Sequence, residues 1–332
     1  MSTIEHTADR RTMRAMIQDR YGPPEVLRLV EAEVPVPDDE QVLVRVVASS
    51  VNALDWHLMR GVPVLVRLTD GLRRPRLAIR GVDVAGRVEA VGRNVTWARP
   101  GDEVFGARNG AFAEYVAGRT FAPRPVNLGF EQAAAIPTAG YTALQAVRDH
   151  ARIQEGQRVL VTGAGGGVGS FAVQIAKAHG AHVTADTGPE HVAMVTALGA
   201  DRVIDRTRED VTRGMDRFDA ILDVAGRSSL SALGRLLTRD GMLVLVGAAG
   251  DGRGLGALVR PVAAVIRSRL GGRRMIPFIA RPNRDDLLVL KGLAEAGTLT
   301  PVIDRTFPLD HAGEAIGYLE TGAARGKVVV RI

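Results

Sequence analysis

Glycines cluster directly after an apolar run near the middle of the chain. Residues 159–162 are Val-Leu-Val-Thr, typical of a buried strand, and the amphipathic segment 170–178 beyond the glycines is typical of a helix. Glycine lets a backbone turn sharply and approach another group closely. The free N–H groups at the start of such a helix attract an anion. The pattern therefore predicts a strand–turn–helix unit that binds a dinucleotide pyrophosphate, with contacts at Gly163, Gly165, Gly166, Gly167, Val168 and Gly169.

Strand and helix patterns alternate downstream of this turn. The next apolar run, 181–185, ends at Asp186, close to the ~20-residue spacing of an acid that binds the adenosine ribose. Further apolar runs lie at 202–205, 218–223 and 242–247. Strands that are apolar on both faces are typical of a buried parallel sheet. We therefore predict an α/β fold with a doubly wound parallel sheet of the Rossmann type, and we expect Asp223 and Gly247, at two strand ends, to face the dinucleotide.

The composition limits the classes to which the chain can belong. Its 332 residues suffice for two domains, 46% hydrophobic residues are typical of a globular protein, and no apolar run approaches the ~18 residues of a membrane span. The chain has no cysteine, which excludes disulfides and thiolate metal sites. Residues 1–12 are polar and lack the apolar core of a signal peptide, so we expect a loose extension there and a cytoplasmic location.

Positive charge is concentrated in arginine-rich stretches. The net charge is +6, and eight arginines lie between residues 253 and 284. Aromatic residues make up only 4% of the chain, so few side chains could stack on nucleic-acid bases. We therefore expect the arginine-rich stretches to be solvated protein faces and not a nucleic-acid-binding surface. Residues 258–270 have the pattern of a basic amphipathic helix. We favour a lid or packing helix there. Attachment to a membrane surface is the less favoured alternative, because such a helix usually carries aromatic anchors.

A β-rich part precedes the strand–helix part. Candidate strands between Gly, Pro and Asp clusters lie at 14–18, 26–31, 41–50, 82–91, 103–106 and 112–117. Many short strands with turn signals predict a small barrel. Near the C-terminus, candidate strands at 302–307 and 327–332 flank a helical pattern at 311–320. The run 275–280 is typical of a last sheet strand, whose free edge would permit a homodimer.

Several motifs, in this order along the chain, resemble one known family. They are Tyr-Gly-Pro-Pro-Glu-Val-Leu at 21–27, Asn-Ala-Leu-Asp at 52–55, Gly-Val-Asp-Val-Ala-Gly at 81–86, Arg-Pro-Gly-Asp-Glu-Val at 99–104, the glycine turn, Leu-Gly-Ala-Asp at 198–201 and Gly-Lys-Val-Val at 326–329. They resemble the medium-chain dehydrogenases/reductases of the zinc-free quinone oxidoreductase (zeta-crystallin-like) type. The resemblance implies a GroES-like β-barrel domain from residues 13–127 and 281–332. It also implies a Rossmann NAD(P)-binding domain at 128–280, with the active site between the two.

The resemblance further implies a site without metal. Zinc-dependent members place cysteine and histidine–glutamate ligands where this chain has Asn52, Val82–Asp83 and, nearby, Thr138. Without a metal, the protein must polarise a carbonyl by hydrogen bonding and orient it against the nicotinamide. Quinones and α,β-unsaturated carbonyls suit such a site, because conjugation already makes the acceptor carbon electrophilic. We therefore expect an NAD(P)H-dependent reductase of quinones or enones; the alternatives are a zinc-free alcohol dehydrogenase and a dinucleotide-binding regulatory or RNA-binding protein.

Three residues are candidates for catalysis. We expect Asn52 to donate to a substrate oxygen and Asp55 to orient Asn52 or a water, although both residue types also cap turns locally. Tyr141 is a candidate proton donor, with a core aromatic of satisfied hydroxyl as the alternative. The resemblance adds Thr142 as a residue facing the cofactor, and a helix residue bonded to its own backbone is the alternative.

The choice between NADPH and NADH stays open in the sequence. The family usually prefers NADPH and has a hydroxyl and a basic residue after the second sheet strand, where this chain has Asp186-Thr-Gly-Pro-Glu190-His191. Two carboxylates there would repel a 2′-phosphate, which favours NADH. His191 and Lys327 are the cations that we expect to offset this repulsion. We expect NADH at least to be accepted.

Overall fold

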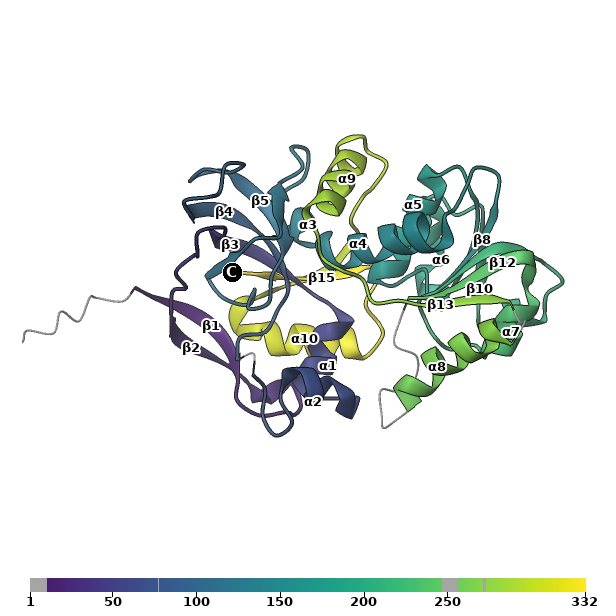
Figure 1. Cartoon of the computed structure of the whole chain (residues 1–332), viewed down its shortest axis with the longest axis horizontal. Helices are drawn as coiled ribbons and strands as arrows, with labels where there is room; N and C mark the ends of the chain where they lie inside the picture. The colour runs from purple at the N-terminus through teal and green to yellow at the C-terminus, as the bar shows by residue number, and fades with distance from the viewer. Residues whose placement is uncertain (1–10, 77, 247–255, 271–272) are drawn as a thin grey trace, which may run out of the picture.

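A six-stranded parallel sheet forms one half of the structure (Figure 1). The computed structural model describes residues 11–76, 78–246, 256–270 and 273–332. The strand order β10-β9-β8-β11-β12-β13 is that of a doubly wound sheet, which confirms the predicted Rossmann fold. Its strands are β8 (Arg158–Thr162), β9 (His182–Thr187), β10 (Arg202–Asp205), β11 (Phe218–Asp223), β12 (Leu237–Leu245) and β13 (Arg274–Pro277).

Helices cover both faces of this sheet. They are α5 (Gly167–Ala178), α6 (Val192–Ala197), α7 (Leu230–Arg235) and α8 (Gly256–Arg269). Along β8, Val159 and Val161 belong to one buried cluster, whereas Leu160 belongs to another. Each such side chain contributes roughly 1.5–3 kcal/mol by leaving water. Burial on both faces explains why the strand is uniformly apolar instead of alternating.

A mainly antiparallel sheet forms the second half and includes the C-terminal strand. Its order is β14-β15-β3-β4-β5-β7, with β6 also paired to β3, and β1 and β2 form a separate hairpin. The strands are β1 (Thr12–Gln18), β2 (Leu27–Glu33), β3 (Val42–Val51), β4 (Asp83–Val91), β5 (Glu103–Ala107), β6 (Tyr115–Gly118), β7 (Phe121–Pro123), β14 (Ile303–Pro308) and β15 (Lys327–Arg331).

Strand β15 joins the two halves. It pairs antiparallel with β3, and the backbone N–H of Gly326, just before it, donates to the carbonyl of Gly165 at 2.9 Å. Four further helices belong to this part of the structure: α3 (Phe130–Ala134), α4 (Pro137–Gln145), α9 (Arg284–Glu295) and α10 (Ala312–Glu320). Because of β15, the predicted glycine turn lies directly against the end of the barrel.

The structure corrects several predicted elements. Residues 53–60 form helix α1 (Ala53–Arg60), followed by α2 (Val64–Asp70), and the sequence pattern predicts neither helix. Strand β1 begins at Thr12, within the predicted loose extension. The predicted strand 242–247 starts five residues earlier, at Leu237, and the helix predicted at 258–270 is present as α8.

Among the described residues, no helix is both long and apolar enough to cross a membrane.

Candidate active site

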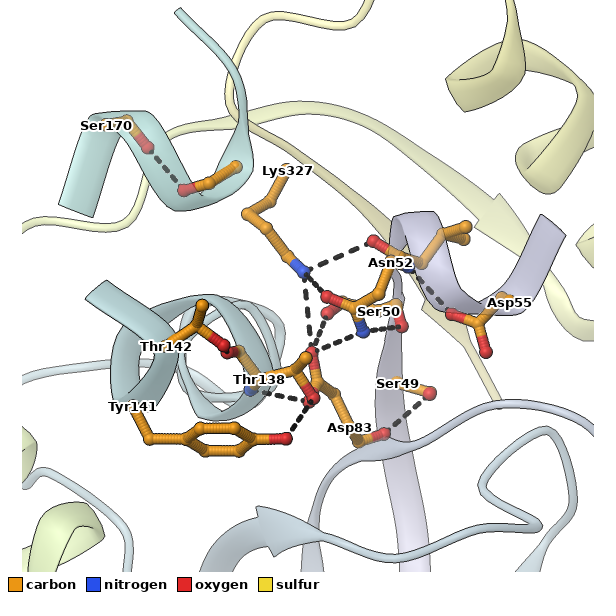
Figure 2. A network of polar contacts seen from close by, with 12 residues as sticks. Ser49, Ser50, Asn52, Asp55, Asp83, Thr138, Tyr141, Thr142, Ser170 and Lys327 are labelled. Carbon is orange, nitrogen blue, oxygen red and sulfur yellow. Dashed lines mark hydrogen bonds and ion pairs between the residues drawn. The ribbon is translucent and has the colours of Figure 1, made fainter. Parts of the chain in front are cut away.

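A buried carboxylate lies at the centre of a polar network between the two halves (Figure 2). Asp83 begins β4 and is fully buried. Its Oδ1 accepts from the backbone N–H of Thr138 at 2.8 Å and from the Thr138 hydroxyl at 2.5 Å. Its Oδ2 accepts from the Ser50 hydroxyl at 2.7 Å and from the Asn52 side-chain amide at 2.9 Å. Asp83 therefore connects β3, the start of α1 and the start of α4.

A buried ammonium group joins the network from the C-terminal strand. Lys327 Nζ lies 2.6 Å from Asn52 Oδ1, 3.2 Å from the carbonyl of Val51 and 3.4 Å from Asp83 Oδ2. Burial lowers the pKa of Lys327, and the charges of the nearby carboxylates oppose this shift. A Cβ placed on Gly167 would lie 3.1 Å from Lys327 Cδ, so the lysine stem passes along the glycine turn. Its ammonium points to the Asp83 network, although the sequence places this lysine among the cofactor contacts.

Asn52 has a defined side-chain orientation because its carbonyl faces the lysine. It precedes α1, and its backbone N–H donates to Asp55 Oδ2 at 2.7 Å. With Oδ1 on Lys327, the amide nitrogen must face Asp83, and its second N–H meets only the carbonyl of Ser50, at 3.4 Å. That N–H is the weakest-held donor in the network and is the one that a substrate oxygen could take over.

Asp55 is buried with one oxygen free. Its Oδ1 lacks a partner among the described residues, and burial raises the pKa of this carboxyl to about 7. The backbone hydrogen bond from Asn52 acts against this shift but does not cancel it. Asp55 therefore holds an exchangeable proton near neutral pH, in the first turn of α1 and not in a loop.

Asp55→Asn should change how stability depends on pH. The folded state binds a proton on Asp55 between about pH 4 and 7 that the unfolded chain, with a pKa of 3.8, has lost. Wild-type stability must then fall as pH rises through this window, because the folded state binds more protons. The unfolding free energy of D55N, measured in urea, should therefore increase relative to that of wild type as the pH rises from 4 to 8.

Asp38→Asn is the matched control for this measurement. The pKa of Asp38 is lowered, chiefly by a hydrogen bond from the backbone of Glu40, and the residue is exposed. Its contribution is complete above the unfolded pKa, so the difference between D38N and wild type should stay flat from pH 5 to 8. If the stability difference between D55N and wild type is also independent of pH, Asp55 does not titrate in this range.

Tyr141 and Thr142 lie on α4 beside the same network. The Tyr141 hydroxyl donates to Thr138 Oγ1 at 3.3 Å, and Thr138 in turn donates to Asp83. Burial raises the pKa of Tyr141, which makes it a weaker acid than a free phenol. Thr142 donates to the carbonyl of Thr138 at 2.6 Å, within its own helix. In this arrangement Tyr141 donates a hydrogen bond to the network. The Thr142 hydroxyl proton is already donated within the helix, so its oxygen can only accept a hydrogen bond from a bound group.

The glycine turn forms a tight cradle at the start of α5. Gly163 has a φ of +68°, and Gly166 directly precedes the helix without any side-chain cap. A Cβ on Gly169 would lie 2.1 Å from the carbonyl oxygen of Gly163. A Cβ on Gly165 would meet the ring of His191. The first N–H groups of α5, from Gly167 to Gly169, have no acceptor within the helix, as at any helix start, and are therefore available to an anion.

Acidic and basic groups meet beyond the ends of β9 and β10. Asp186 Oδ1 is buried and has no partner among the described residues, and burial raises the pKa of Asp186 to about 6. The charges of Arg206 and Arg227 oppose that shift, so both guanidinium groups act on the site. His191 Nε2 lies 3.0 Å from Glu190 Oε1. A free carboxylate oxygen beside two cations suits a ribose with or without a 2′-phosphate.

Arg206 was not among the predicted site residues, although a signal for it exists. It directly follows β10, and β10 pairs in parallel with β9, with Ile204 opposite Asp186. Residues after neighbouring parallel strands emerge at the same sheet edge. The other omissions, Ser50, Thr138 and the central role of Asp83, depend on contacts between distant segments.

Three further residues predicted to contact the dinucleotide remain to be placed: Asp223, Gly247 and Val168. Asp223 Oδ1 accepts from Thr162 at 2.7 Å and from the N–H of Gly226 at 3.2 Å, and Oδ2 pairs with Arg260 of α8. Both oxygens of the Asp223 carboxylate are thus bound by groups of the protein itself, at the carboxyl end of β11. Gly247 lies outside the described residues. Val168 packs partly against the main core from the first turn of α5.

The barrel, the parallel sheet and the polar network between them define a dinucleotide-dependent oxidoreductase of the medium-chain type. Residues 38–122 match the alcohol dehydrogenase GroES-like domain, and residues 198–330 match the family described as zinc-binding dehydrogenase. A quinone oxidoreductase from Lama guanicoe is 32% identical over 96% of this chain and 98% of its own. The NADPH-dependent alkenal/one oxidoreductase of Arabidopsis thaliana is 32% identical over 99% of this chain and 83% of its own.

The solved structures agree with these relatives. The quinone oxidoreductase from Coxiella burnetii superposes with a TM-score of 0.85 at 31% identity, over 97% of this chain and 100% of the other. The chain belongs to the quinone oxidoreductase-like family of the medium-chain dehydrogenases/reductases. The resemblance in the sequence is thereby confirmed, and the protein is an oxidoreductase.

Proposed function

We propose that this enzyme reduces quinones or α,β-unsaturated carbonyl compounds with NADPH or NADH, without a metal ion. Relatives named as quinone and alkenal/one oxidoreductases support the substrate class. The observation that carries the proposal is the network around Asp83. By the family resemblance, Asn52 and Asp83 stand where other members have zinc ligands and Thr138 stands nearby; here Asp83 binds Asn52 and Thr138, and Lys327 binds Asn52 and Asp83.

The donor set of this network does not suit zinc. Structural and catalytic zinc sites use thiolates, imidazoles and carboxylates with free lone pairs. Here the carboxylate of Asp83 already accepts hydrogen bonds from Ser50, Asn52 and Thr138, and the ammonium of Lys327 would repel a second cation. Hydrogen bonds among these side chains, with Lys327 as a donor, thus organise the site in place of a metal.

The glycine turn fits a pyridine dinucleotide. A bound nicotinamide would supply the hydride. The first N–H groups of α5 would hold the pyrophosphate, and Asp186 would accept from a ribose hydroxyl. Asn52 would donate its weakly held N–H to the substrate carbonyl, because Lys327 on the amide oxygen polarises that group. Asp55, protonated near neutral pH, is the candidate source of the proton that completes reduction.

Oxidation of NADH and NADPH, followed at 340 nm with chelator present, tests this proposal. Quinones and enones should be turned over, and simple alcohols with NAD⁺ or NADP⁺ should not. Turnover of alcohols alone would favour the zinc-free alcohol dehydrogenase. RNA binding in folded protein that binds neither cofactor would favour the regulatory alternative.

Asp186→Ser should shift the cofactor preference toward NADPH. The carboxylate repels a 2′-phosphate, whereas Arg206 and Arg227 attract it, so removing the acid leaves the cations unopposed. We expect the ratio of kcat/KM for NADPH to that for NADH to rise roughly tenfold or more. Arg206→Ala should move the same ratio in the opposite direction. Equal effects of D186S on both cofactors would contradict this role.

The homodimer also stays a prediction. Strand β13 is the last strand of the parallel sheet and pairs with β12 in the described part of the chain. No strand of the described residues pairs with its second edge, so another copy could add a strand there. Sedimentation velocity of the purified enzyme measures the assembly directly.

A further inference from the structure

Helix α8 buries small side chains and exposes large aliphatic ones, the opposite of a typical amphipathic surface helix. Its inward side is small: Ala264 is fully buried in the sheet cluster and Ala263 packs beside it. Its large aliphatic side chains are exposed instead, by fractions of 38–81%. Together with Leu270, directly after the helix, they form one stripe, called the α8 stripe here, because their spacing repeats every three to four residues: Val259, Val262, Val265, Ile266 and Leu270. A surface helix normally buries such residues, so the α8 stripe marks an interaction surface.

The exposure of the stripe does not come from loose attachment of the helix. Arg260 pairs with the buried Asp223 and donates to the carbonyl of Ser228 at 2.5 Å. Arg267 donates to the Ser231 hydroxyl, and Ser268 lies near the N–H of Met275 at the start of β13. Figure 1 shows α8 along the outer side of the parallel sheet, next to β13. Polar and small residues therefore hold α8 in place, and its large aliphatic residues are left for another surface.

The charge around the stripe is of one sign. From residue 252 to residue 284 the sequence contains eight arginines and no acidic residue. Within the described residues, Arg267, Arg269 and Arg273 lie on or just after α8 and form no ion pair with a carboxylate. A second copy docked through the same face would bring these arginines together. An anionic partner would neutralise them.

We propose that the α8 stripe and its arginines dock this enzyme on an anionic lipid surface. An aliphatic stripe with flanking arginines suits a helix that lies in the plane of the lipid headgroups, with its apolar side toward the acyl chains. Arginine heads remain at the phosphates while their stems lie along apolar surface.

Co-sedimentation with vesicles tests the apolar half of this proposal. The full-length enzyme should bind vesicles of phosphatidylglycerol and phosphatidylcholine, but not pure phosphatidylcholine. V262D/I266D should lose roughly tenfold or more of this binding. The control V36D/M215D adds the same two charges at residues that are 89% and 91% exposed elsewhere, and it should bind nearly as wild type. Reductase activity in solution should be retained by both variants.

Charge reversal tests the electrostatic half. R269E should weaken binding to anionic vesicles by roughly tenfold, whereas R20E, with the same charge change at another exposed arginine, should have a smaller effect. Added salt should weaken wild-type binding. Wild-type enzyme that ignores anionic vesicles would overturn the proposal. So would a change in sedimentation coefficient caused by V262D/I266D, because a second copy would then be the occupant of the α8 stripe.

Discussion

Gly169→Ala should abolish binding of NADH and NADPH. The added Cβ would lie 2.1 Å from the carbonyl oxygen of Gly163 and 2.7 Å from Cα of Ala164. Both are backbone atoms, so the clash cannot be relieved by moving a side chain, and the turn must open. The N–H groups at the start of α5 then lose their common direction toward the pyrophosphate. We expect the dissociation constant, measured by calorimetry or nucleotide fluorescence, to rise roughly hundredfold or more.

Two other glycines give this experiment a graded series. A Cβ on Gly165 would lie 2.4 Å from Cγ and 2.6 Å from Cβ of the buried His191, so the segment that carries His191 must move. Because this Cβ meets no backbone atom of the turn itself, G165A should weaken binding less than G169A. Gly292, within α9, has nothing within 4 Å of an added Cβ, so G292A should leave binding unchanged and the helix slightly more stable. Circular dichroism separates loss of binding from loss of fold. A dissociation constant for G169A within threefold of wild type would contradict the proposed cofactor site.

The parts of this site that sequence predicts are those built from adjacent residues. The strand β8, the glycine turn and α5 are contiguous, so their periodicity and composition suffice to predict them. The carboxyl end of β9 at Asp186 follows from the same pattern. Helix α1 was missed because its eight residues are too short for a clear period, and Asn52 before it suits a turn as well as a helix start.

The parts that sequence does not predict depend on long-range pairing. Lys327 and Asn52 are 275 residues apart, and they meet because β15 pairs antiparallel with β3, with Val328 opposite Val51. A lysine in a C-terminal strand carries no local sign of that partner. The sequence therefore assigns Lys327 to the cofactor phosphate, the nearest anion expected, and the network around Asp83 becomes visible only in three dimensions.

Lys327→Met should cost both stability and turnover. It leaves the buried carboxylate of Asp83 without its cation and Asn52 Oδ1 without its donor. Removing one partner of a buried ion pair typically costs about 3–5 kcal/mol of unfolding free energy. Lys177→Met is the matched control, because Lys177 pairs with Asp201 at the surface, where such a pair contributes about 0–1 kcal/mol. Urea unfolding compares the two variants directly.

The double variant Asp83→Asn with Lys327→Met separates the structural role of the lysine from its effect on catalysis. With both charges gone, the Asn52 amide can flip, so that its oxygen accepts from the amide introduced at position 83 and the buried network is satisfied again. Much of the unfolding free energy should return. Turnover should not, since the flipped amide no longer directs its weakly held N–H to the substrate and no ammonium polarises it. We expect kcat to stay roughly hundredfold below wild type, with KM for the nucleotide little changed. Recovery of kcat together with stability would show that Lys327 only holds the fold, and Asn52 would then lose its assignment as the donor to the substrate carbonyl.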